Sequence, residues 1–332
     1  MALALSSCGT SDHGAPVAQK STPTITAAPP LAPALSPAQA RDAIANYSKV
    51  NNTANATQDL NLLGSVEGGP REAMSKADHK GQAALPIGER RAYIPWSYRL
   101  SETDLFIPRL GSGKPRWFAA ITRGGNQQQY ARVLVMAENT TTKQWEMVST
   151  VDLADPHQLP TIVRDKDGYA TAVDATSKSL ATPVDQLRAA VVDNFVTGGL
   201  SGQKVLAPTA SSQQQIKIHN EAARKFGTRG TTKFSAVPPE FTGSYALKTT
   251  TGTFVVFAHT HAQNDAVTAP GYRIVPEMQD RAWLGTTPAP GFNYRFTCSD
   301  AAAVPTGSGS SSLLGYGCRR TDAKPVGPSE SV

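Results

Sequence analysis

The sequence predicts an α+β fold built from two tandem units, each with two helices followed by an antiparallel sheet. Two observations support this prediction. A helix-capping signal followed by apolar residues at helical spacing occurs twice, at Ser36 and at Thr182. After each helical stretch, the pattern changes to short runs of β-branched and aromatic residues separated by turn signals. At 332 residues, the chain is long enough for two domains of ordinary size.

The first unit is expected at residues 36–155. Ser36, Pro37 and Gln39 have the order of a capping box with proline at the first helical position. Apolar residues continue the helical spacing until Gly68-Gly69-Pro70 stops it, and a shorter helix is expected at 72–79. Strands are expected at 91–98, 104–109, 117–123, 130–137 and 144–151.

The second unit is expected at residues 182–318, after a connector at 156–181. Thr182-Pro183-Val184-Asp185 repeats the capping pattern, and Gly198-Gly199 is expected to end the helix. A second helix is expected at 213–226. Strands are expected at 233–237, 244–248 and 253–261, with further alternating segments ending at Cys298 and Cys318. The repeated order of elements suggests a duplication, although residue identity between the halves is low.

Both ends of the chain have compositions that do not favour a packed core. Residues 9–35 are rich in Pro, Ala and Thr, and we expect them to form an extended, disordered spacer. The tail at 319–332 is also expected to be disordered. No apolar run approaches the roughly 18 residues that a membrane-spanning helix needs.

The three cysteines indicate export and lipid attachment. Leu5-Ser6-Ser7-Cys8-Gly9 resembles a bacterial lipobox, in which the cysteine is diacylated and becomes the mature N-terminus. Residues 1–8 would then be the remnant of a lipoprotein signal, since Met1–Leu5 supplies only the end of its apolar segment. The alternative is a chance LSSC at the start of a cytosolic protein. The lipobox interpretation predicts a protein anchored to the outer face of the cell membrane.

The other two cysteines are expected to pair. A Cys298–Cys318 disulfide would close a loop of about 20 residues, which stabilises a fold by around 3 kcal/mol in the chain-entropy estimate. Both cysteines stand at the downstream ends of their expected strands. A simple antiparallel hairpin would place them at opposite ends, so the bridge is expected to need another layout.

Three stretches resemble a family of actinobacterial lipoproteins of unknown function. They are KVNNTANATQDLNLLGSVEGGP (Lys49–Pro70), RDKDGYATAVD (Arg164–Asp174) and the LSSC box. The resemblance implies a location rather than an activity, so it assigns no catalytic residue. The order of two helices and a curved sheet is also similar to the cone-shaped fold of the nuclear-transport-factor-2-like superfamily, which includes binding proteins and enzymes.

His259-Thr260-His261 is the most suggestive local pattern for chemistry. Residues two apart on a strand share a face, so both imidazoles could bind one metal ion. Asp265 is the nearest further candidate, but its spacing is not that of a known metal motif. The alternative is that the histidines mark where a core-facing strand emerges into solvent. We expect no resident metal and no cofactor.

The segment Arg90–Arg99 interleaves arginines with aromatic residues. On an exposed surface, Trp96, Tyr98 and Arg99 could stack on sugars and pair with the acidic groups of wall polymers. The favoured alternative is an amphipathic strand with Trp96 and Tyr98 in the core and the arginines in water.

Two classes of function remain. The first is a non-catalytic envelope lipoprotein that binds a partner protein, a wall polymer or an apolar small molecule. The second is a hydrolase or isomerase with its site in a cavity of one unit. No nucleophile elbow, P-loop, dinucleotide-binding or zinc-protease motif is present. The formal net charge of +6 is spread along the chain, whereas nucleic-acid binding needs denser clustering.

Overall fold

The computed structural model describes residues 31–123, 131–176, 180–202 and 204–326. These residues form helices and mostly antiparallel sheets, which confirms the predicted α+β class. Cys8, most of the predicted spacer and the last residues of the predicted tail lie outside the described residues. Among the helices in the described ranges, none combines the length and apolar character needed to cross a membrane.

The helices alternate with strands along the chain. They are α1 (Pro37–Thr57), α2 (Leu60–Gly64), α3 (Gly69–Ala83), α4 (Val184–Val196), α5 (Ala210–Ala222) and α6 (Arg281–Leu284). The predicted start of α1 is confirmed, because Ser36 Oγ accepts from the Gln39 backbone N–H and Gln39 Oε1 accepts from the Ser36 N–H. Gln58, at a φ of 56°, ends α1 earlier than the apolar spacing suggested.

The start of α4 differs from the prediction. Its N-cap is Pro183, and no side chain caps it. The Thr182 hydroxyl instead accepts a hydrogen bond from Ser311 at 3.0 Å. Its end is as predicted: Gly198 and Gly199 have φ values of 73° and 81°. A Cβ on Gly199 would lie 2.9 Å from Asn194 Oδ1, so glycine is required there for space as well as for backbone conformation.

Two larger sheets organise the described chain. The first has the order β2-β4-β5-β6, and the second has the order β12-β11-β10-β8, with β9 also paired to β10. The first comprises β2 (Asp104–Phe106), β4 (Trp117–Arg123), β5 (Ala131–Glu138) and β6 (Trp145–Asp152). The second comprises β8 (Gly230–Ala236), β9 (Ser244–Lys248), β10 (Gly252–Val267), β11 (Gly291–Pro305) and β12 (Ser312–Pro325).

A small third sheet joins segments that are distant in sequence. It contains β1 (Ala32–Pro33), β3 (Pro108–Leu110) and β7 (Ala170–Thr171). The ordered body therefore begins before Ser36, because β1 pairs with β3 and Ala34 and Leu35 are buried in the core. The predicted connector is likewise structured. It supplies β7 and forms a bridge between Ala172 and Leu247.

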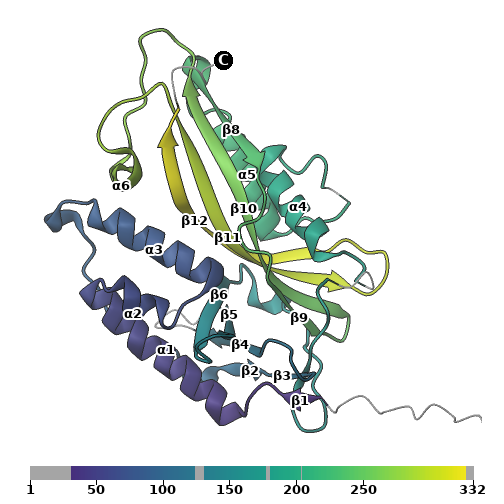
Figure 1. The fold of residues 1–332 in the computed structure, drawn as a ribbon. Helices are drawn as coiled ribbons and strands as arrows, with labels where there is room; N and C mark the ends of the chain where they lie inside the picture. The colour runs from purple at the N-terminus through teal and green to yellow at the C-terminus, as the bar shows by residue number, and fades with distance from the viewer. Residues whose placement is uncertain (1–30, 124–130, 177–179, 203, 327–332) are drawn as a thin grey trace, which may run out of the picture. The chain divides into compact units, whose positions relative to one another are not determined.

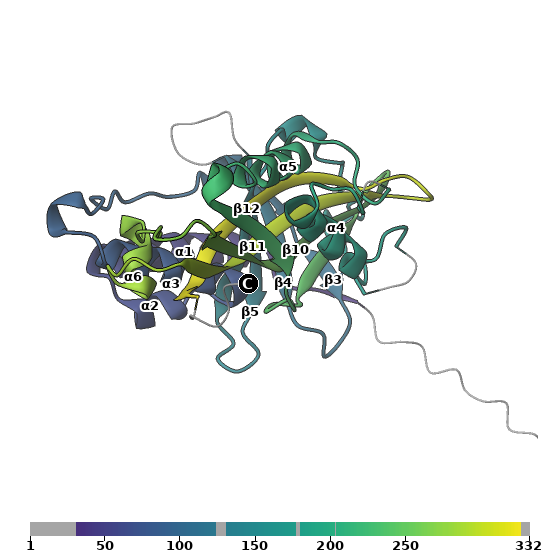
Figure 2. The same cartoon turned by 90° about the horizontal axis from the view of Figure 1, so that it is seen from above.

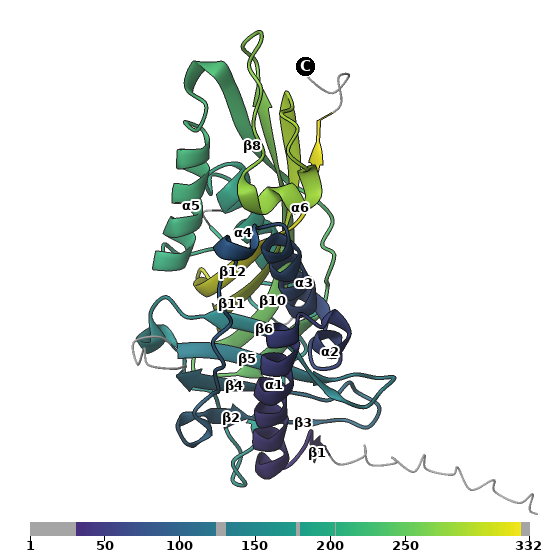
Figure 3. The same ribbon diagram turned by 90° about the vertical axis from the view of Figure 1, so that its left-hand side faces the viewer.

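The order of the layers is shown by the hydrophobic cores that their side chains share. One face of the first sheet packs on α1, with Ile44 and Tyr47 against Phe118 and Leu134 (Figures 1 and 3). The other face packs against the second sheet through a core that includes Val133, Phe254, Val256 and Leu314. The far face of the second sheet packs on α4. The order is therefore helix, sheet, sheet, helix.

The shared central core buries the sides on which the two sheets face each other. In β4, Trp117, Ala119 and Ile121 lie in the core between the sheets, whereas Phe118 and Ala120 lie in the core under α1. The central core draws on both predicted units, 36–155 and 182–318, and the division into these units stays a prediction. The possible duplication stays a prediction.

The first half also contacts the second through α3. This helix lies against β11, β12 and α6 (Figure 2). Arg319 on β12 pairs with Asp78 on α3 at 3.0 Å. β12 runs to Pro325, so residues 319–325 are paired in a sheet and the prediction of disorder there is wrong.

Residues 91–98 do not form the predicted strand. Tyr98 makes an isolated β-bridge, and residues 91–97 belong to no strand. The Asn52 side chain on α1 takes the place of a strand partner: its Nδ2 donates to the Trp96 carbonyl at 2.7 Å, and its Oδ1 accepts from the Trp96 N–H at 3.1 Å. This single amide satisfies both backbone polar groups of Trp96, and Gln82 Oε1 accepts from the Arg91 N–H at 3.2 Å.

Ser36→Ala is expected to destabilise the fold by about 1 kcal/mol, because it leaves an N–H at the start of α1 without its acceptor. The loss is measured as a lower urea midpoint in equilibrium unfolding. Ser101→Ala, at an exposed position outside any helix cap, is the matched control and should shift stability by less than about 0.5 kcal/mol. Equal midpoints for the wild type and Ser36→Ala would contradict the role of this cap.

Candidate functional site

The two histidines singled out from the sequence lie together inside the fold. His259 and His261 are on β10, and their side chains are 0% and 2% exposed. The strand therefore does not emerge into solvent at this point. It is buried on both faces from Gly252 to His261. The alternative interpretation, in which the histidines mark where the strand emerges into solvent, is wrong.

The two histidines belong to a hydrogen-bonded chain that begins at a buried aspartate, Asp300. Asp300 on β11 accepts from His259 Nδ1 through Oδ2 at 2.5 Å, and His259 Nε2 lies 3.2 Å from His261 Nδ1. One of these two facing nitrogens must donate the proton to the other. Asp300 is 0% exposed, and its Oδ1 has no hydrogen-bond partner among the described residues. This carboxylate was not identified from the sequence.

Aromatic rings enclose His261. Phe195 of α4 stacks on it with ring centroids 4.2 Å apart, and Phe296 of β11 stacks on it at 5.0 Å. Burial, together with the charge of His259, holds the pKa of His261 well below its usual value. The neutral form of His261 is therefore favoured, and its unprotonated ring nitrogen has a lone pair that can bind a metal ion.

The predicted pairing of the other two cysteines is present as a Cys298–Cys318 disulfide. The expectation that a simple hairpin could not hold it is wrong. β11 continues to Pro305 before the turn, so neither cysteine ends its strand, and the two are direct register partners in an antiparallel pair. The sequence between Cys298 and Pro305 contains three alanines, which hid the length of the strand.

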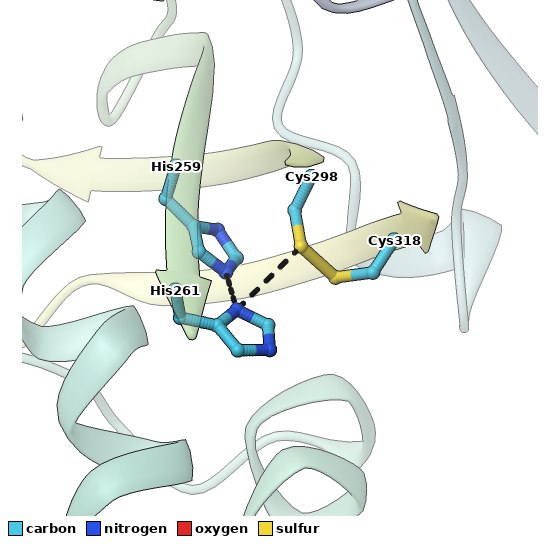
Figure 4. Close-up of side chains that lie close together, drawn as sticks. All are labelled: His259, His261, Cys298 and Cys318. Atoms are coloured by element: carbon cyan, nitrogen blue, oxygen red, sulfur yellow. Dashed lines mark hydrogen bonds between the residues drawn. A yellow bond between two sulfur atoms is a disulfide. The ribbon is translucent and has the colours of Figure 1, made fainter. Parts of the chain in front are cut away.

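The disulfide lies against the histidines. In the sheet register, His259, Cys298 and Cys318 are aligned across β10, β11 and β12, and all project on one face. Cys298 Sγ is 3.9 Å from His261 Nδ1 (Figure 4). One nitrogen or sulfur from each of the four residues lies within 4.8 Å of the corresponding atom of the others. The structure thus brings together two predicted sites that the sequence placed 37 positions apart.

Asp265 does not join this cluster. Its carboxylate is fully buried, but it accepts from Lys225 Nζ at 2.7 Å and from the Thr232 hydroxyl at 2.7 Å. Gln263 donates to it as well, at 2.9 Å. Asp265 therefore ties β8 and β10 to the turn that follows α5. This geometry does not support Asp265 as a metal ligand.

The three candidate residues of the Arg90–Arg99 segment, Trp96, Tyr98 and Arg99, all have partners within the protein. Trp96 packs edge-on against Tyr98 at 4.8 Å, and both contact the core under α1. Arg99 is exposed and pairs with Glu102 at 3.3 Å. These contacts agree with the alternative in which the aromatic residues face the core.

The beginning of the same segment lines a cleft. Arg90, Arg91 and Tyr93 border a hollow of about 670 Å³. Residues of α3, α6 and the edge strand β12 also line it, including Trp283 and Cys318. The cleft contains groups from both halves of the chain, which sequence spacing alone could not have associated.

The cleft is polar and carries an excess of positive charge. Its lining includes four arginines and two aspartates, which leaves a net charge of +2; these are Arg90, Arg91, Arg319, Arg320, Asp78 and Asp280. The aspartates are engaged, since Asp78 pairs with Arg319 and buried Asp280 pairs with Arg320.

Arg90 is held in place, and no acidic side chain in the described part of the chain forms an ion pair with it. Its guanidinium donates to the backbone carbonyls of Leu85 at 3.0 Å and Ala83 at 2.9 Å. Carbonyls fix the position of the cation but do not cancel its charge, so Arg90 remains available to an anion.

The chain matches a known family and several relatives. The model of a domain of unknown function, DUF8094, matches residues 31–325. An uncharacterized lipoprotein of Streptomyces coelicolor is 47% identical over 326 residues, covering 97% of this chain and 91% of the relative. An uncharacterized lipoprotein of Streptomyces avermitilis is 26% identical over 285 residues, covering 83% and 81%.

No solved structure matches the chain. The expected similarity to the cone-shaped superfamily is not confirmed and stays a prediction. The family match covers nearly all of the residues that the structure describes, and the similarity to the first relative extends over almost the whole chain. The expectation raised by the LSSC box and the two longer stretches is confirmed: the chain belongs to this actinobacterial family of lipoproteins of unknown function.

Proposed function

We propose that this protein is anchored through lipid on Cys8 to the outer face of the cell membrane, and that its body binds an acidic polymer of the envelope. The binding site in this proposal is the arginine-lined cleft between Arg90–Tyr93, α6 and β12. The protein acts as a binding module that holds or senses a wall component close to the membrane.

The anchor part of the proposal is supported by the lipobox and by the relatives. Cys8 follows Leu5-Ser6-Ser7, and the two relatives that cover most of the chain are named lipoproteins. The Pro-, Ala- and Thr-rich composition of residues 9–30 suits a spacer that holds a folded body away from the bilayer. A disulfide is also more typical of a protein outside the cytosol.

The proposal of an acidic ligand rests on one observation. Arg90 has no ion-pair partner among the described residues and lies beside exposed Arg91 on the lining of a polar cleft. Guanidinium groups bind carboxylates and phosphates with paired hydrogen bonds. Tyr93 and Trp283, which also line the cleft, offer rings on which sugars can stack. The polar lining disfavours the apolar small molecule considered from the sequence.

Replacing Cys8 by Ala is expected to abolish lipid attachment. Cells expressing the full-length protein with its native leader are labelled with a fatty-acid analogue, and the label on the protein is compared between wild type and Cys8→Ala. We expect label and membrane association in the wild type alone. Ser7→Ala keeps the thiol and a small residue before it, so it should be labelled normally. An unlabelled wild-type protein would refute the anchor.

Removing two of the four cleft arginines, Arg90 and Arg91, is expected to weaken binding to a phosphate-bearing wall glycopolymer. At about 0.2–1 kcal/mol for each exposed charge, Arg90→Gln with Arg91→Gln should raise Kd roughly 2- to 30-fold. The dissociation constant is measured by calorimetry with purified polymer at low and at physiological salt. Arg224→Gln removes an exposed charge outside the cleft and is the control. Equal losses in both variants would mean that the polymer recognises net charge and not the cleft.

A further inference from the structure

The cluster on β10, β11 and β12 contains the donor set of a tetrahedral zinc site. We propose that, when the Cys298–Cys318 disulfide is reduced, His259, His261 and the two cysteines bind one Zn²⁺. The disulfide and the zinc site are then alternative states of the same four residues. This inference does not depend on the anchor or on the polymer ligand.

The spacing of the donor atoms fits this ion. Zn–N bonds of about 2.0–2.1 Å and Zn–S bonds of about 2.3 Å place the ligand atoms of a tetrahedron about 3.3–3.8 Å apart. His259 Nε2 and His261 Nδ1 are 3.2 Å apart, and Cys298 Sγ lies 3.9 Å from His261 Nδ1. Figure 4 shows the two imidazoles and the disulfide gathered around one position. After reduction, the sulfurs separate to ligand spacing by rotation about their own side-chain bonds.

Asp300 has the position of the carboxylate that supports a metal-binding histidine. Ligating histidines commonly donate their second ring N–H to a carboxylate, which fixes the tautomer and strengthens the ligand. Asp300 accepts from His259 Nδ1, which leaves His259 Nε2 as the atom that faces His261 and the sulfurs. Asp300 is fully buried, and its Oδ1 has no hydrogen-bond partner within the described ranges.

The scaffold and the surroundings also favour a metal site. The four ligands come from three neighbouring strands of one sheet, so their backbone positions are set before any ion binds. Phe195 and Phe296 close the site against water on the ring faces of His261. Cys318 is half-buried and is among the residues that line the polar cleft.

The change of state balances with a dithiol as the reductant. The dithiol transfers two electrons and two protons to the disulfide, breaks the S–S bond and is itself oxidised to a disulfide. Zn²⁺ then displaces one proton from each cysteine thiol, and the two thiolates cancel the charge of the ion. Both imidazoles bind as neutral ligands.

The experiment uses the full chain without an affinity tag, stripped of metal and divided into an oxidised sample and a sample reduced with a phosphine. Each sample is titrated with Zn²⁺ and, separately, with Co²⁺. We expect the reduced chain to bind one equivalent of Zn²⁺. With Co²⁺, we expect the visible bands of a tetrahedral ion and thiolate-to-metal charge transfer. The oxidised chain, identical in sequence, should bind no stoichiometric ion.

Three variants test the assignment of roles. His261→Gln removes a ligand and should lower zinc affinity at least tenfold, whereas His157→Gln, at an exposed position outside the cluster, should not change it. Asp300→Asn should lower the affinity by about 10- to 100-fold while keeping the cobalt spectrum tetrahedral, because Asp300 positions His259 and does not touch the metal. Circular dichroism of each variant checks that it is folded.

Two results would overturn the proposal. One is a reduced wild-type chain that binds no more zinc than the oxidised chain. The other is a folded His261→Gln variant that binds zinc as tightly as the wild type. Because the oxidised and reduced samples share one sequence, the first comparison remains decisive even if a variant fails to fold.

Discussion

The arrangement of the molecule depends on one strand that is buried on both faces. β10 pairs with β8, β9 and β11, and its side chains alternate between two cores. Phe254 and Val256 face the first sheet, and Val255 and Phe257 face α4. Burial of this many apolar side chains provides the main driving force for joining the two halves. It also means that any polar residue on β10 must find its partners inside the protein.

The polar residues of β10 meet that demand in two different ways. Asp265 is surrounded by Lys225, Thr232 and Gln263, which satisfy its carboxylate with ordinary hydrogen bonds. His259 and His261 instead face each other, a second acid and two sulfurs. The first arrangement is what stabilisation requires. The second arrangement brings together imidazole and sulfur groups, which are ligands for transition metals. This difference separates a structural site from a candidate functional one.

Prediction from sequence succeeded where the signal was local. The capping box at Ser36, the glycine stop after α4 and the bounds of β4 and β9 depend on neighbouring residues, and each agrees with the structure. It failed where a distant partner decided the outcome. Residues 91–98 have the composition of a strand, but at Trp96 the Asn52 side chain on α1 takes both backbone hydrogen bonds. Likewise, the alanines after Cys298 carried no strand signal, although β11 continues through them.

The sequence by itself determined the α+β class, the family and the pairing of the two downstream cysteines, because these follow from short patterns and from the number of thiols. Only the tertiary structure decided that the two halves share a core, that the histidines lie beside the disulfide, and that Asp300 supports them. The physical reason is register. A strand pattern tells which residues share a face, but it does not tell which residues of other strands lie opposite them. Those cross-strand neighbours set the chemistry of the site.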